Sequence, residues 1–167
     1  MTLASALHHL PFVLFLGLLA LAAISDLREY RIPNTLTLAI AALYLAQVLT
    51  PGVGADVMGS VVLAATVLAA GTGLFALGLV GGGDVKLLAA VSLWVGPAAF
   101  PLFLIVMALA GGAIALVQLS NWRLGLAMFL EGMGQTGFTR VLTGRDVPYG
   151  LAIAIGAVFA VAAPAGM

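Results

Sequence analysis

The sequence predicts an all-α membrane protein with six transmembrane helices, and three observations lead to this fold class. Of the 167 residues, 63% are hydrophobic and only 7% are charged, whereas a soluble domain carries about 25% charged residues. The apolar residues fall into long uncharged runs, and a helix needs roughly 20 such residues to cross a bilayer. The basic residues fall only in alternate connections between these runs. We expect one membrane-embedded domain over residues 1–167.

The first helix is expected within Leu3–Ser25, which contains no formally charged residue. Its densest apolar part is Leu10–Ile24. A cleaved secretory signal has a basic region at its start, and residues 1–25 contain no Lys or Arg. We therefore expect this segment to be retained as a membrane helix.

The second helix is predicted at about residues 34–50. Pro33 with Asn34 is a start signal, because an Asn side chain can cap the free amides of a first helical turn. Pro51 and Gly52 end the run.

The third and the last helices follow from similar signals. The uncharged stretch Val57–Gly83 predicts a helix at about 57–79, and Asp56 is expected to cap it as a solvated side chain. Val147–Met167 predicts the last helix, which starts near Pro148.

The uncharged stretch Leu87–Trp122 is long for one crossing and short for two. Residues 95–101, with the sequence VGPAAFP, carry a glycine and two prolines that disfavour a continuous helix. We therefore predict a short helix at about 84–95 and a longer one at about 98–119.

The positions of the basic residues support this division, because Lys and Arg are enriched in cytoplasmic loops. With six helices, the first, third and fifth connections hold all of them: Arg28, Arg31, Lys86, Arg123, Arg140 and Arg145. A single crossing in place of two would move three arginines to the other side. The sequence thus predicts a multi-pass protein of the inner (plasma) membrane with both termini outside.

The long connection at about 120–147 mixes apolar side chains with sparse polar ones. Two interpretations remain open for it: a helix that lies in the interface of the cytoplasmic leaflet, or a flexible loop.

Composition excludes several kinds of chemistry. The chain has no cysteine, so it has no disulfide, thiol nucleophile or cysteine-ligated zinc. The net charge is zero, which argues against a nucleic-acid partner. His8 and His9 are adjacent and so point in different directions on a helix. We expect no metal site and no cofactor.

Among the acidic residues, Asp26 and Asp84 are the catalytic candidates. Asp26 follows the apolar run of the first helix and Asp84 opens the fourth, so the count of crossings puts both at the cytoplasmic face. Two carboxylates that share a proton can hydrolyse a peptide bond, one activating water and the other polarising the carbonyl. Each also has a simpler interpretation, as a helix-end charge beside arginines or as a helix N-cap.

The other acidic residues have simpler explanations. Glu29 lies between two arginines and balances their charge, while Glu131 and Asp146 lie in the long connection, where solvation explains them.

Three glycines precede Asp84. Gly81, Gly82 and Gly83 would allow positive φ angles and a close approach of an extended substrate strand. A flexible turn or close helix packing is the alternative.

Three segments resemble the type IV prepilin peptidases, membrane aspartic proteases of the G-x-G-D type. SDLREYRIPN (25–34) contains an Asp, five intervening residues and then Ile-Pro-Asn, and GGGDVKLLAA (81–90) contains G-x-G-D-x-K-L. VPYGLAIAIG (147–156) is similar to the start of the last helix in that family. The resemblance extends over essentially the whole chain.

The resemblance implies an aspartic endopeptidase with Asp26 and Asp84 as its catalytic residues. Matched motif residues are implied to bind substrate or shape the site: Gly81, Gly83, Lys86, Pro33, Asn34, Pro148 and Tyr149. Lys86 is two residues from Asp84 and should point away from it. It would instead hold the loop, contact lipid phosphates or simply favour the cytoplasmic side.

The implied reaction removes the basic cytoplasmic leader from type IV prepilin-like precursors, single-helix proteins of type IV pilus assembly and protein secretion. The implied partners are these precursors and the lipid bilayer. Larger family members also methylate the new N-terminus and carry a cysteine-rich N-terminal portion. This chain is similar to the short members without it, and N-methyltransferase activity is not expected.

The helix ends suggest roles for the two aspartates. A helix N-terminus favours a carboxylate and a C-terminus disfavours one, so we expect Asp84 to be the ionised base and Asp26 the protonated acid, within a coupled pair. The sequence leaves three alternative functions: a small ion-coupled membrane transporter, a presenilin-like protease, whose Tyr-Asp and Pro-Ala-Leu motifs are missing, and a non-enzymatic assembly subunit.

Overall fold

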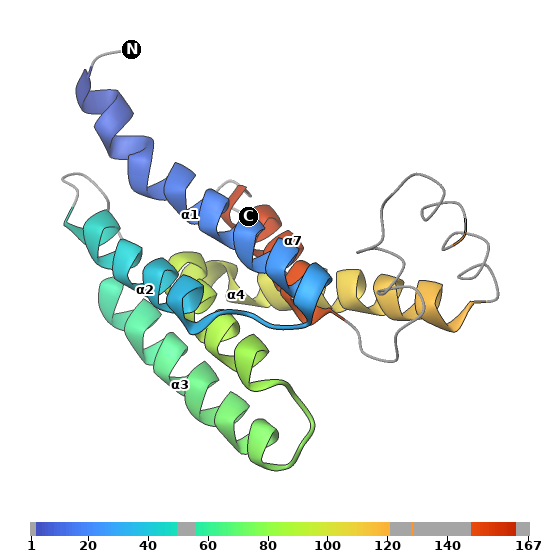
Figure 1. Ribbon diagram of the computed structural model, residues 1–167. Coiled ribbons are helices and arrows are strands. Elements are labelled where there is room, and N and C mark those ends of the chain that lie inside the picture. The colour runs from blue at the N-terminus through green and yellow to red at the C-terminus, as the bar shows by residue number, and fades with distance from the viewer. Residues whose placement is uncertain (1–2, 50–55, 121–127, 129–147, 163–167) are drawn as a thin grey trace.

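The computed structural model describes residues 3–49, 56–120, 128 and 148–162, and its elements within these ranges are helices (Figure 1). They are α1 (Leu3–Glu29), α2 (Asn34–Val48), α3 (Val57–Ala76), α4 (Gly82–Leu119) and α7 (Tyr149–Ala162). The all-α prediction is confirmed. The long connection at about 120–147 lies outside the described residues apart from its first residue and Met128.

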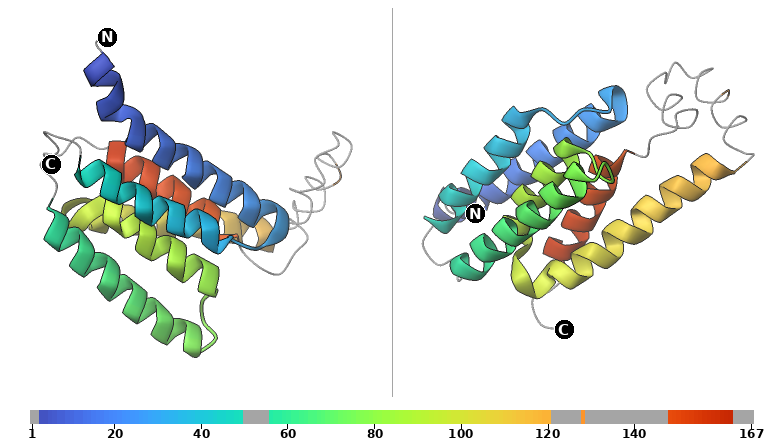
Figure 2. Two further views of the ribbon diagram at one scale, coloured as in Figure 1. Left: turned by 60° about the vertical axis from the view of Figure 1, so that its left-hand side comes forward. Right: turned by 90° about the horizontal axis from the view of Figure 1, so that it is seen from below.

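Successive helices run back and forth through one bundle (Figures 1 and 2). The end of α1 and the starts of α2, α4 and α7 lie together at one end of the bundle, which we call the acidic end because Asp26 and Asp84 lie there. The start of α1 and the end of α7 lie at the opposite end.

The middle of the bundle is built around Trp94. Its ring stacks on Phe15 of α1 with the ring centroids 4.4 Å apart, and meets Tyr44 of α2 edge-on. Its indole nitrogen donates a 3.0 Å hydrogen bond to the Ile40 carbonyl. Aromatic side chains with a satisfied polar atom provide both apolar burial and a fixed orientation, so this cluster sets how α1, α2 and α4 lie against one another.

Helix α4 is broken where the sequence predicts a division. Gly96 has φ 67° and ψ 169°, which is non-helical, and Pro97 follows it. The half before Gly96 packs along α3 and the half after it along α7. A Cβ on Gly71 of α3 would come within 2.6 Å of Val85 in the first half, so these two helices pack closely.

Within the described residues, three segments have the length and composition of membrane spans: Leu10–Glu29, α3 and α4. Helices α2 and α7 are apolar but shorter, with 15 and 14 residues. The structure therefore supports a membrane protein, while the count of six crossings and the orientation of the termini stay predictions. Four helix ends differ from the prediction: α1 continues through Asp26 to Glu29, α2 ends at Val48, α3 ends at Ala76 and α4 starts at Gly82. The turn after α3 contains Gly78, whose φ is 72°.

One predicted helix cap is confirmed and one is wrong. The Asp56 carboxylate accepts a 2.9 Å hydrogen bond from the Gly59 amide and caps α3. At the start of α2 the capping position belongs to Pro33, which makes no side-chain cap. Asn34 is the first helical residue, and its side-chain oxygen instead accepts a hydrogen bond from Lys86 of α4. The Asn34 side chain thus bonds to a residue of another helix instead of capping its own helix.

We expect Gly96→Ala to destabilise the protein by about 1–3 kcal/mol, because the backbone angles at Gly96 are open essentially to glycine alone. Gly73→Ala is the matched control: a Cβ there would have no atom within 4 Å, and replacing a helical glycine should stabilise by about 0.5–1 kcal/mol. Thermal unfolding in detergent measures both. Equal effects of the two substitutions would contradict a strained break in α4.

Candidate active site

A cavity of about 460 Å³ lies at the acidic end and contains both candidate aspartates. We call it the acidic cavity. Its lining comes from the end of α1, the connection to α2 and the start of α4. The lining residues are Asp26, Glu29, Tyr30, Arg31, Ile32, Pro33, Asn34, Gly81, Gly82, Gly83 and Asp84. The structure thus brings together the two sequence motifs that carry the aspartates.

Asp26 lies in the last turn of α1 and is only 5% exposed. Its Oδ2 atom accepts a 2.7 Å hydrogen bond from the backbone amide of Gly150, in the first turn of α7. A buried carboxylate is costly unless it is hydrogen-bonded, and the free amides of a helix start are suited to an anion. The last helix therefore holds the first aspartate in place.

Only glycine fits at position 150. A Cβ built there would lie 2.8 Å from Oδ2 of Asp26 and 2.9 Å from its Cβ. Real Cβ atoms essentially never approach other atoms this closely, so any side chain at this position would displace the carboxylate or the helix.

Asp84 is the third residue of α4 and is partly buried. Its carboxylate accepts a hydrogen bond from the Gly81 amide, the residue just before the helix, and it interacts electrostatically with Asp26. A side chain at the third helical position that reaches back to the capping residue is half of a capping box. The local helix start thus fixes Asp84 as α7 fixes Asp26.

The connection between α1 and α2 is what brings the two aspartates to one cavity. Tyr30 ends α1 in the left-handed conformation, with φ 52°, and its amide donates to the Asp26 carbonyl at 2.9 Å. The Ser25 hydroxyl donates to the Arg31 carbonyl at 2.8 Å. Ile32 is then buried and lies beside Gly83, 3.4 Å from where a Cβ on that glycine would lie.

The predicted positive φ angles in the GGGD stretch are wrong. Gly81 is extended, with φ −71°, and Gly82 and Gly83 are the first residues of α4. Among the glycines in the described ranges, Gly78 and Gly96 have positive φ. A Cβ on Gly81 would come within 2.8 Å of the Asp84 carboxylate, while the approach of a substrate strand to these glycines stays a prediction.

Other predicted site residues lie beside the acidic cavity rather than in its lining. Lys86 is exposed and donates a 3.0 Å hydrogen bond to Oδ1 of Asn34, so it ties the start of α2 to α4. Pro148 is buried next to Gly150, and Tyr149 is 50% exposed with its ring near Gly111 of α4. Pro148 and Tyr149 thus position the start of α7.

The expected division of roles between the aspartates considered only the position of Asp26 at the C-terminus of α1. It lies in the C-terminal turn of α1, as predicted, but its carboxylate also meets the N-terminus of α7. Each aspartate thus accepts a backbone amide at a helix start. The helix ends no longer distinguish the two, and the assignment of base and acid stays a prediction.

Gly150 and Tyr30 were not among the residues selected from the sequence. Gly150 stands within a quoted segment, VPYGLAIAIG, but nothing in one sequence shows that its amide reaches Asp26. Tyr30 has no sequence signal for a left-handed conformation, which is uncommon outside glycine.

Comparison with models of protein families matches residues 13–116 to the type IV leader peptidase family. The match covers more than half of the chain and contains both aspartates, whereas α7 with Gly150 lies beyond it. Comparisons with curated proteins and with solved structures gave no match.

We expect Gly150→Ala to lower the free energy of unfolding by about 1–3 kcal/mol, the range for overpacking a tight site. Gly112→Ala in α4 is the control, because a Cβ there would have no atom within 4 Å. Thermal unfolding of both variants in detergent gives the comparison. If Gly150→Ala unfolds at the temperature of the unchanged protein, the contact between α7 and Asp26 is not formed in solution.

Proposed function

Because this chain belongs to the type IV leader peptidase family, we propose that it is a membrane aspartic endopeptidase that removes the leader peptide from type IV prepilin-like precursors. One observation carries the proposal beyond the family itself. Two carboxylates from separate helices line one cavity at one end of the bundle, and each accepts a backbone hydrogen bond.

The proposed mechanism uses the two carboxylates as one unit. One takes a proton from a water molecule, which then attacks the scissile carbonyl, while the other donates a hydrogen bond to the carbonyl oxygen. The C–N bond then breaks as the tetrahedral intermediate collapses, and the carboxyl group that took the proton from water gives it to the leaving amine. Neighbouring carboxylates can share a single proton, which supplies the base and the acid together. The backbone amides of Gly150 and Gly81 restrain the two side chains, and restrained groups need less reorganisation in the transition state.

The charge of the acidic cavity suits a basic leader. Its lining includes three acidic residues, Asp26, Glu29 and Asp84, and one basic residue, Arg31. A cleft with an excess of one sign of charge raises the local concentration of ligands of the other sign. This supports a leader that carries Lys or Arg close to the bond that is cut.

The proposed location is the inner (plasma) membrane, with the acidic end at the cytoplasmic face. Arg28, Arg31 and Lys86 all belong to the acidic end, and basic residues favour the cytoplasmic side. The proposed partners are single-helix precursors in the same bilayer, whose basic leaders lie on that side.

The alternative of an ion-coupled transporter lacks comparable support. A transporter places its ion-binding groups near the middle of the bilayer. Asp26 and Asp84 share one end of the bundle instead, and Asp56 caps α3 at the other end. The family match also favours the protease.

We expect Asp26→Asn and Asp84→Asn each to reduce cleavage by about a thousandfold, within the range for loss of an acid or base. The assay is cleavage of a leader-bearing single-helix precursor in lipid nanodiscs. Asp56→Asn is the matched control, because Asn caps a helix about as well as Asp, and it should cleave normally. Normal cleavage by either site variant would exclude the mechanism with two carboxylates.

The orientation can be tested with single cysteines, because the chain has none of its own. Leu79 is 69% exposed in the turn before α4, and Leu49 is 81% exposed after α2. We expect a membrane-impermeant maleimide added to intact cells to label Leu49→Cys, and to label Leu79→Cys only after permeabilisation. The reverse pattern would place the acidic end outside.

A further inference from the structure

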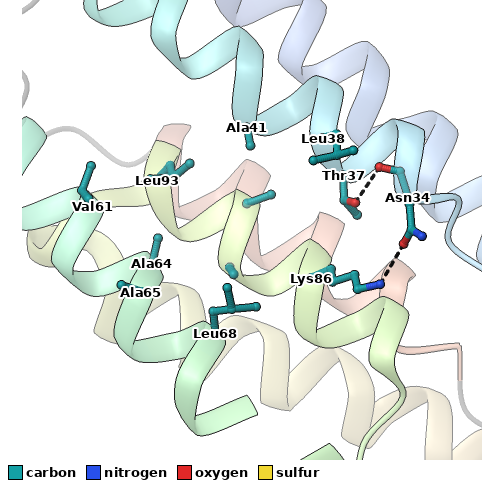
Figure 3. Close-up of a pocket in the computed structure, with 12 residues that line it drawn as sticks. Asn34, Thr37, Leu38, Ala41, Val61, Ala64, Ala65, Leu68, Lys86 and Leu93 are labelled. Carbon is teal, nitrogen blue, oxygen red and sulfur yellow. Dashed lines mark hydrogen bonds between the residues drawn. The ribbon is translucent and has the colours of Figure 1, made fainter. Parts of the chain in front are cut away.

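A groove runs along α2, with the first half of α4 as its floor and α3 as its other wall (Figure 3). We call it the α2–α3 groove. Two adjoining cavities, of about 630 Å³ and 360 Å³, share the same four residues and so form one continuous hollow. The shared residues are Leu38, Ala41, Val61 and Leu93.

The groove exists because α2 and α3 both pack on α4 without comparable packing on each other. Each of the three helices contributes alanines to the lining, and these are Ala41, Ala64, Ala65, Ala89 and Ala90. Small residues at a helix surface allow the backbone of another membrane helix to approach closely. The groove is therefore shaped to admit a helix rather than only a side chain.

The walls of the groove are open sideways. Leu38 on α2 is 68% exposed, and Val61 and Leu68 on α3 are 47% and 44% exposed. Around a membrane-spanning bundle, such apolar surface faces lipid. A helix that is already in the bilayer can enter this groove without passing through water.

The groove adjoins the acidic cavity. Asn34 lines both of them, and the Lys86 amino group that bonds it lies at the same end of the groove. Lys86 is the one charged residue in the lining, and the rest of the groove toward Val57 is almost wholly apolar. A substrate chain whose scissile peptide bond lies between the two aspartates can thus continue past Asn34 into the groove.

We propose that the α2–α3 groove binds the apolar helix of the substrate, the segment that follows the scissile bond, after lateral entry from the bilayer. The inference rests on the proposed peptidase function. The groove runs beside α2, whose 15 residues span about 22 Å at 1.5 Å per residue. The substrate helix lies parallel to α2, starts at the acidic cavity and leaves the basic leader among the carboxylates.

Crosslinking tests the position of the substrate directly. The enzyme carries Asp84→Asn to prevent cleavage, together with Ala65→Cys in the groove or Ala70→Cys on an outward face of α3. The substrate is a reporter with a basic leader and an apolar helix, with single cysteines through roughly the first three turns after the scissile bond. We expect a bismaleimide to link the reporter to Ala65→Cys, with a helical periodicity, and not to Ala70→Cys.

A kinetic test uses the active enzyme and the same reporter. Ala65→Phe fills the groove and should raise KM about tenfold, the scale expected when a packed site is overfilled. Ala70→Phe adds the same side chain to an exposed position that lines neither cavity, and should leave KM and kcat unchanged. Thermal unfolding of both variants in detergent checks that they fold.

The outcomes separate this inference from the proposed function. If the unchanged enzyme does not cleave the reporter, the proposed function fails. If it cleaves, but crosslinks form equally at both cysteines or at neither, the groove does not hold the substrate helix. Labelling of the groove by a photoactivatable phospholipid that persists at saturating reporter would also overturn the inference, because a lipid would then be the resident occupant.

Discussion

The arrangement of this protein depends on one buried hydrogen bond, from the Gly150 amide to the Asp26 carboxylate. A carboxylate that is 5% exposed needs a partner, since an unpaired buried charge is among the costliest features a fold can contain. The partner here belongs to the start of another helix and not to a side chain. The bond therefore sets where α7 starts relative to α1, while buried residues such as Ile153 and Ala157 pack the rest of that helix.

The break at Gly96 lets one helix serve both aspartates. Before the break, α4 lies beside α3 and carries Asp84 at its start. After the break, it lies beside α7, where a Cβ on Gly156 would come within 3.0 Å of the Phe103 carbonyl. An unbroken helix could not follow both directions. The first half positions one carboxylate, and the second half supports the helix that positions the other.

Much of the fold could be predicted because apolar runs and strong breakers act locally. The division at residues 95–101, the Asp56 cap and the presence of both aspartates at one end all followed from such signals. The remaining features are tertiary. Asn34 is a good local cap, but its oxygen is taken by Lys86 from another helix. The Gly150 amide is invisible in a sequence, because every residue except proline has one.

The roles of the glycines also depend on tertiary packing that the sequence does not show. A glycine is permissive, and the sequence states only that a side chain is missing. At Gly96 the missing side chain permits an unusual backbone angle. At Gly71 it permits close packing against Val85 in an ordinary helix, and at Gly150 it leaves room for a carboxylate. Which of these applies depends on what lies opposite, and that is decided by the packing of the whole bundle.

The bond between the first helix and the last also has a consequence for biosynthesis. A chain is made from its N-terminus, and Asp26 precedes Gly150 by 124 positions. Throughout most of translation, the nascent chain therefore holds a carboxylate in its first helix without the amide that later receives it. The two aspartates reach their final arrangement only when α7 has been inserted and packed. A chain that ends before α7 lacks the amide that holds the Asp26 carboxylate in this structure.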